Sequence, residues 1–159
     1  MKKRVLMSLV VLAIIGTSAI FAQQPTLDKL TFILNADKQS YRATAKDSNI
    51  SGEVVIPATY NNLPVTGIDL FSGCREMTSI TLPASVVEIS SQKFSPSSKL
   101  TSVTFLGSNT KVASNVILGT DLDIAYKANG AGTYTRQAGG KNWRKGGTVC
   151  PTCGGTGYI

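Results

Sequence analysis

The chain has 159 residues, enough for one domain or for one domain with a tail. Hydrophobic residues make up 42% of it, which excludes general disorder. It contains no histidine, so a histidine-based triad, a histidine general base and a histidine metal ligand are all excluded. Three cysteines are too few for a small fold held together by many disulfides. The composition therefore favours a small binding or structural module over an enzyme.

The first 22 residues have the layout of a secretory signal peptide. Lys2, Lys3 and Arg4 form a basic start, an apolar run follows, and small residues lead to Ala22. We predict cleavage after Ala22, which makes Gln23 the mature N-terminus. The alternative is an uncleaved membrane anchor, for which the run is near the lower limit of about 17–25 residues. No second apolar run follows, so we expect an exported chain (periplasmic, cell-surface or secreted) without a transmembrane segment.

Basic residues are distributed unevenly along the chain. The leader holds three of the 16 basic residues, so the mature chain has 13 against 9 acidic ones, a net charge of +4. Residues 124–159 contain no acidic residue. Such a segment could meet an anionic surface or polysaccharide, but a solvated basic face is the simpler interpretation. No nucleic-acid partner is expected for an exported protein. The basic residues of this segment are Lys127, Arg136, Lys141, Arg144 and Lys145.

The middle of the chain repeats itself. Residues 77–83 (MTSITLP) align with residues 100–106 (LTSVTFL) at an offset of 23, and Phe71 and Phe94 lie at the same offset. The segment 54–57 aligns with 80–83 at an offset of 26. A period of about 20–29 residues with Leu or Ile anchors is typical of a leucine-rich repeat solenoid.

The alternation within each unit predicts short strands with one buried face. Pro57 and Pro83 end their strands, because proline cannot donate to a ladder. A second extended segment follows at 64–68 and again at 85–89, and Phe71 and Phe94 are expected to fill the inside of each coil. The residues predicted to face the core are Val54, Ile56, Ile80, Leu82, Val103 and Phe105.

The flanks must cap such a short stack. Residues 30–34 and 40–44 are predicted to form a hairpin with its turn at 36–39. The expected fold class is mainly β with short coils, a leucine-rich repeat solenoid of about two to three units with flanking caps. The expected division is 1–22 for the signal peptide, 23–52 for the N-terminal capping hairpin, 53–125 for the solenoid and 126–159 for a Gly-rich basic tail.

The repeat resembles a known family. The stretches YNNLPVTGI (60–68), FSGC (71–74) and MTSITLP (77–83) are similar to the BspA-like leucine-rich repeat of bacterial surface and secreted proteins. The resemblance covers about Leu30 to Leu106 and departs from the pattern at 97–99, where Ser-Ser-Lys replaces a Gly-Cys pair. It implies a buried thiol at Cys74, adhesion to or binding of a host or matrix ligand, and no catalytic residues.

The repeat pattern ends at Gly107, and glycine becomes frequent towards the C-terminus. Residues 116–126 are predicted to add a last strand-like coil, with Val116, Leu118, Leu122 and Ile124 as candidates for burial. Tyr126, Tyr134 and Trp143 are expected to pack back on that coil as a cap. The alternative is a flexible exposed tail, because glycine is frequent there.

Cys150 and Cys153 stand in the motif CPTCGGTG. They could form a disulfide in an oxidising compartment, or supply half of a zinc site that two chains share, since a structural zinc ion needs four ligands. A redox pair and idle thiols are further alternatives, although the glycines disfavour the helix that would lower a thiol pKa. The sequence predicts no other cofactor.

Two functions from different classes follow. The first is an exported, non-enzymatic binding or adhesion module whose partner is a protein or matrix ligand. The second is a thiol or zinc-binding protein that acts through Cys150 and Cys153. For the first, the outward-facing side chains of the predicted strands form the candidate binding surface. These are Glu53, Val55, Ser79, Thr81, Ser102 and Thr104.

Overall fold

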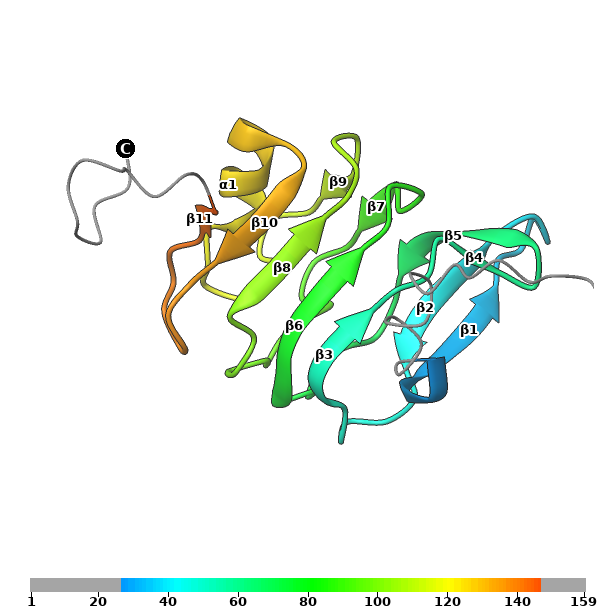
Figure 1. Ribbon diagram of the computed structural model, residues 1–159, viewed down its shortest axis with the longest axis horizontal. Helices are drawn as coiled ribbons and strands as arrows, with labels where there is room; N and C mark the ends of the chain where they lie inside the picture. Colours follow the sequence, from blue (N-terminus) through cyan, green and yellow to red (C-terminus); the bar gives the residue numbers. More distant parts are fainter. Residues whose placement is uncertain (1–26, 147–159) are drawn as a thin grey trace, which may run out of the picture.

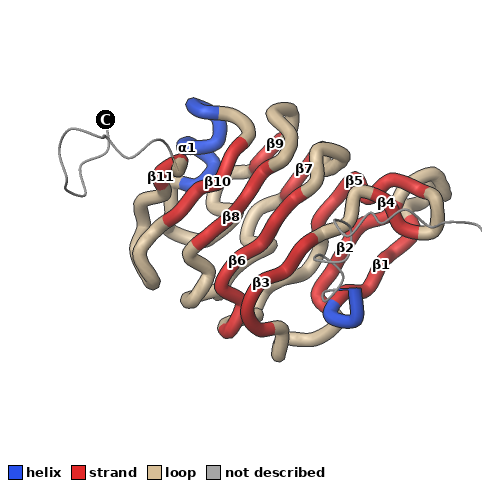
Figure 2. The backbone as a smooth tube through the Cα atoms, in the orientation of Figure 1, coloured by secondary structure: helices blue, strands red, loops and turns tan. Residues whose placement is uncertain are grey.

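The computed structural model describes residues 27–146. They form a short stack of coils whose strands line up into two sheets, and the stack runs from its N-terminal end at the right to its C-terminal end at the left of Figures 1 and 2. One sheet, called the front sheet, consists of β3 (Ser51–Val55), β6 (Glu76–Leu82), β8 (Ser102–Phe105), β10 (Gly132–Thr135) and β11 (Arg144–Lys145). The other, called the rear sheet, consists of β1 (Leu30–Leu34), β2 (Tyr41–Ala45), β5 (Leu63–Ile68), β7 (Glu88–Ile89) and β9 (Lys111–Val112), with β4 (Thr59–Tyr60) beside β5. Each of three coils gives one strand to each sheet: β3 and β5 in the first coil, β6 and β7 in the second, and β8 and β9 in the last. The predicted fold class, a short solenoid with caps, is confirmed.

The front sheet is parallel in its repeat part. β3 pairs with β6, and β6 with β8, in the register Val54–Ile80–Val103. The predicted strands are therefore present, and the repeat offset becomes the strand-to-strand register.

The rear sheet collects the second extended segment of each coil. β2, β5, β7 and β9 are parallel neighbours, and the short β4 pairs antiparallel with β5. The predicted segment 64–68 thus becomes β5, whereas only Glu88 and Ile89 of the predicted segment 85–89 form a strand, β7.

The core lies between the sheets and follows the predicted alternation. All six side chains predicted to face inward on the front strands are buried, as are Phe71 and Phe94. The two phenylalanine rings are tilted against each other with centroids 5.9 Å apart. Each coil thus covers the apolar edge that the previous coil leaves exposed.

The N-terminal end of the stack is closed by the predicted hairpin. After the 3-10 turn η1 (Leu27–Lys29), β1 (Leu30–Leu34) runs antiparallel to β2. The turn between them is held by a hydrogen bond from the main-chain N–H of Asn35 to the carbonyl of Ser40. Phe32 stacks on Tyr60 with ring centroids 4.0 Å apart, which ties the hairpin to the first coil.

The C-terminal end differs from the prediction of a last strand-like coil. Residues Leu122–Asn129 form the helix α1. Val116 and Leu122 are buried as predicted, but Leu118 and Ile124 are 63% and 66% exposed. For Ile124 the reason is the helical period: Leu122 and Tyr126, four residues apart, share the buried face, and Ile124 points away from it. Leu118 lies in a turn before the helix.

The cap is completed by a hairpin that extends the front sheet. β10 (Gly132–Thr135) pairs antiparallel with β8 and with β11 (Arg144–Lys145). The predicted packing of Tyr126, Tyr134 and Trp143 on the last coil is confirmed, because all three are buried. Tyr126 Oη donates to the carbonyl of Gly107 over 2.7 Å, and Tyr134 Oη donates to that of Gly130 over 2.6 Å.

Within residues 27–146, no helix has the length and apolar character that a membrane span requires.

Candidate binding face

The outward-facing side of the front sheet carries all six predicted surface residues, and the ladder arranges them in rows. One row runs from Val55 through Thr81 to Thr104, because these residues are register partners on β3, β6 and β8. The neighbouring strands are about 4.8 Å apart, so each row is regular along the stack. Figure 1 shows these strands side by side.

A second row runs parallel to the first, two residues earlier in each strand. Glu53, Ser79 and Ser102 are register partners there. Glu53 is exposed, and the two serines are partly exposed. The residues between the rows, Val54 and Ile80 among them, point into the core, as the period of a strand requires.

Both rows continue onto β10, a strand that the sequence did not lead us to predict. Thr133 pairs with Thr104, and Thr135 pairs with Ser102. The hydroxyls of Thr104 and Thr133 are hydrogen-bonded at 2.9 Å. The alternation Thr-Tyr-Thr around the buried Tyr134 was a signal for this strand, but the frequent glycines around it suggested a tail. These eight residues, with Thr133 and Thr135 added to the predicted six, are called the binding face below.

The side chains of the binding face are short, apart from the glutamate. The binding face consists of short hydroxyl side chains, one valine and one carboxylate, and none of these forms a pair of a nucleophile and a base. Within residues 27–146 no three Cys, Asp or Glu side chains lie close enough together to hold a metal ion. Cys150 and Cys153 lie outside the described residues, so the disulfide and zinc hypotheses stay predictions.

Cys74 occupies the interior position that the resemblance implies. It is a free, fully buried thiol, and its Sγ lies 3.9 Å from the carbonyl oxygen of Asp47. Burial raises the pKa of the Cys74 thiol, with a smaller contribution from the nearby Asp47 charge. A thiol in this setting is a small core residue and not a reactive one.

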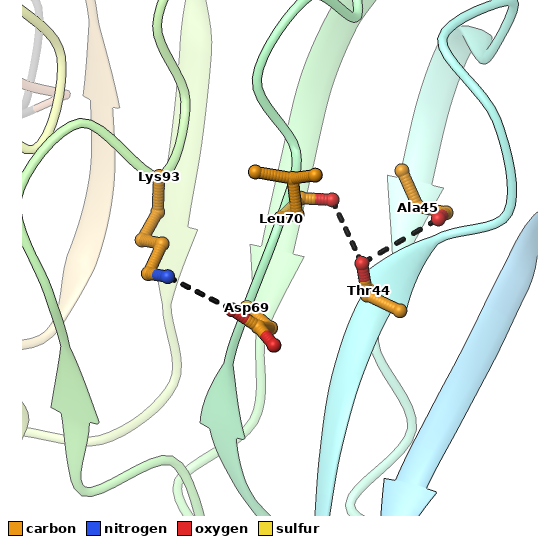
Figure 3. A network of polar contacts seen from close by, with 5 residues as sticks. All are labelled: Thr44, Ala45, Asp69, Leu70 and Lys93. Carbon is orange, nitrogen blue, oxygen red and sulfur yellow. Dashed lines mark hydrogen bonds and ion pairs between the residues drawn. The ribbon is translucent and has the colours of Figure 1, made fainter.

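Polar contacts on the rear side hold successive coils in register (Figure 3). Lys93 Nζ donates to Asp69 Oδ1 over 2.8 Å, and Thr44 Oγ1 donates to the carbonyl of Leu70 over 2.9 Å. The hydrogen bond from Lys93 lowers the pKa of the Asp69 carboxyl below its ordinary value, and the charges of Lys93 and Arg42 add to the effect against the opposing desolvation. These contacts bridge neighbouring coils and are structural.

The parallel strands of the front sheet and the recurring phenylalanines show a repeat, and comparison with known protein families finds one. The family model of the BspA-type leucine-rich repeat region, which describes six copies, matches residues 15–129. The chain belongs to the BspA-type leucine-rich repeat family. The match extends beyond the range of the sequence resemblance, Leu30 to Leu106, at both ends.

Among solved structures, this BspA-type chain is similar to a leucine-rich repeat protein of T. pallidum. The two are 23% identical with a TM-score of 0.48, and the match covers 55% of this chain and 41% of the other. The BspA-type chain thus spans less than half of that protein's length. No curated protein matches the sequence.

Proposed function

We propose that the protein is an exported, non-enzymatic binding module that holds a protein or matrix ligand against its binding face. Membership of the BspA-type repeat family supports a binding role. The observation that carries the proposal is the continuity of the two outward rows across β3, β6, β8 and β10. A regular face of this kind suits recognition by area rather than by a pocket.

The side chains of the binding face suit such contacts physically. Serine and threonine lose less rotamer freedom on binding than the long charged side chains do. Their hydroxyls both donate and accept, so they can pair with main-chain groups of a partner in either sense. The neighbouring basic residues of the C-terminal cap, such as Arg144 beside Thr135, favour encounter with an acidic partner.

Binding to an immobilised basement-membrane matrix, measured by surface plasmon resonance, tests the proposal. The double variant Thr81→Glu, Thr104→Glu places two charges in the middle of the binding face. It should weaken binding about tenfold or more, because a desolvated, unpaired charge at an interface is strongly unfavourable.

The matched control is Ser90→Glu with Ser91→Glu, two exposed residues directly after β7 of the rear sheet. It adds the same charge and should bind as the unaltered chain does. Equal loss in both variants, or no binding of the unaltered chain, would contradict the proposal. Circular dichroism melts of both variants establish that each is folded.

Export is tested separately, by fractionating native cells and sequencing the N-terminus of the exported chain. We expect Gln23 as the first residue, because the small and apolar residues up to Ala22 suit cleavage there. Retention of Met1 on the exported chain would contradict the cleavage.

A further inference from the structure

A groove of about 500 Å³ lies where the last coil meets the C-terminal cap. It does not involve the eight residues of the binding face. Its walls are formed by three serines, a glutamine, a glycine, an arginine and three apolar side chains, and none of its lining residues, all of them described, is acidic. The wall residues that matter here are Ser95, Ser97, Ile117, Leu118 and Arg136.

Arg136 is the charged group of the groove, and it has no carboxylate partner. The two ion pairs found within residues 27–146 are Lys93–Asp69 and Lys99–Glu76, and Arg136 belongs to neither. Its guanidinium instead donates to three main-chain carbonyls, those of Leu100, Gly140 and Ser97, over 2.7–3.0 Å. These bonds use three of its five N–H groups and leave its positive charge uncompensated.

The position of Arg136 is fixed by the ring below it. Its Cζ lies 4.9 Å from the centre of the buried Trp143 ring. Partial burial lowers the pKa of Arg136, but the guanidinium stays charged at neutral pH. The groove therefore holds a pre-oriented cation, already ordered and partly desolvated.

Two buried polar atoms without a hydrogen-bond partner lie beside this cation. They are Ser97 Oγ and Trp143 Nε1, and no other buried side-chain nitrogen or oxygen within residues 27–146 lacks a partner. Ser97 accepts from Arg136 through its carbonyl, and Trp143 lies under the guanidinium. A buried hydroxyl without a partner is unfavourable by about 1–3 kcal/mol, so its retention in the wall of a groove calls for an explanation.

The opposite wall is apolar. Leu118 lines the groove while remaining 63% exposed, and the buried Ile117 lies next to it. Ser95 Oγ accepts the main-chain N–H of Leu118 over 2.6 Å, which leaves the hydroxyl hydrogen of Ser95 for a ligand. Charge, hydroxyl donors and an apolar wall thus meet in one groove.

We propose that this groove binds an organic carboxylate that carries an apolar group. The carboxylate lies against the free N–H groups of Arg136 and accepts from the Ser97 hydroxyl, which reaches it by a change of its χ1 rotamer. The apolar group lies on Leu118 and Ile117. A free branched-chain acid and the C-terminal residue of a peptide share this chemistry. The site is independent of the binding face, and either can exist without the other.

Trp143 is the single tryptophan of the chain, so its fluorescence reports on this site alone. The purified full chain is titrated with N-acetyl-leucine, with N-acetyl-Gly-Gly-Leu and with N-acetyl-leucinamide, which lacks the carboxylate. We expect a saturable change with the first two and none with the amide. Tighter binding of the tripeptide identifies a peptide C-terminus as the ligand, and tighter binding of the amino acid identifies a small acid.

Three variants locate the site. Arg136→Met should weaken N-acetyl-leucine binding about tenfold or more, as expected for the loss of a charge-assisted hydrogen bond. Ser97→Ala should weaken it about threefold without lowering the melting temperature, because the hydroxyl has no partner in the free protein. Leu118→Ser changes an exposed side chain and should weaken N-acetyl-leucine but not acetate.

The matched control is Arg75→Met, which removes an exposed arginine outside the groove and should bind as the unaltered chain does. Equal binding of the amide, equal loss in Arg75→Met, or no saturable change with any probe would overturn the proposal. If Arg136→Met fails to fold, Ser97→Ala and Leu118→Ser decide the question by themselves.

Discussion

Phe71 and Phe94 occupy equivalent places in successive coils, and their ring centroids lie 5.9 Å apart with the ring planes tilted by 52°. Both side chains are fully buried, and the main-chain N–H of Phe71 donates to the carbonyl of Lys93, next to Phe94 in the chain. The sequence repeat is therefore seen as a direct contact, since the first two coils place the same ring against each other, and the third coil has Ile117 at the same offset.

Replacing Phe94 by alanine should destabilise the protein by about 3–5 kcal/mol, because it opens a cavity in the middle of the stack. Urea unfolding followed by circular dichroism measures the loss. The control is Leu106→Ala, a leucine that is 60% exposed, which should change stability by less than about 0.5 kcal/mol. A Phe94 variant as stable as the control would show that the ring does not support the stack.

The two faces of β6 should respond oppositely to charge. Ile80→Asp should abolish cooperative unfolding, because Ile80 is buried and an unpaired buried charge is unfavourable by several kcal/mol, about the stability of a small domain. Thr81→Asp should be tolerated, since Thr81 lies on the outward side. Thermal melts compare the two variants. Loss of the cooperative transition in both would show that the strand register is wrong.

The Asp69–Lys93 contact makes stability depend on pH in the acid range. In the folded state the pKa of Asp69 is lowered, so folding favours the ionised form of this carboxyl. In the unfolded chain, aspartate has a pKa of about 3.9. The contribution is therefore present above that unfolded value and is lost as the pH falls through the folded pKa.

The variant Asp69→Asn tests this assignment. It should melt below the unaltered chain at neutral pH, and the difference should vanish at strongly acid pH. Glu76→Gln is the control, because its ion pair with Lys99 has side chains 56% and 58% exposed, against 28% and 24% for Asp69 and Lys93. Its effect should be small at every pH. A pH-independent difference for Asp69→Asn would contradict the assignment.

Cys150 and Cys153 are expected to pair with each other in the exported protein, with Cys74 reduced. Two intervening residues make a short closed loop, so the bond removes little entropy from the unfolded chain. Changing both to serine should therefore barely move the melting temperature of the repeat core. Mass spectrometry of the unreduced, alkylated protein should find Cys150 and Cys153 unmodified and bridged.

The zinc hypothesis gives the opposite result for the same measurement. Both thiols would be alkylated after chelation, zinc would be present at half a mole per chain, and a chelator would dissociate a dimer. That outcome would reject the disulfide.

The sequence by itself determined the repeat part of this protein. The alternation around Val54 and Ile80, the recurrence of Phe71 and Phe94 and the turn after Leu34 all predicted elements that the structure contains. They did so because a solenoid repeats one local pattern, and each coil contacts only its neighbours. The outward position of Thr81 follows from the same alternation.

The C-terminal end was decided only by the tertiary structure. Leu122 to Asn129 is a short segment whose apolar residues suit a strand or a helix, and it becomes a helix that buries Leu122 and Tyr126 against the open end of the last coil. Arg136 and Trp143 come together there through contacts with residues distant in sequence, among them Ser97 and Leu100. No local pattern encodes such contacts, because they depend on the shape of the surface that the last coil leaves uncovered.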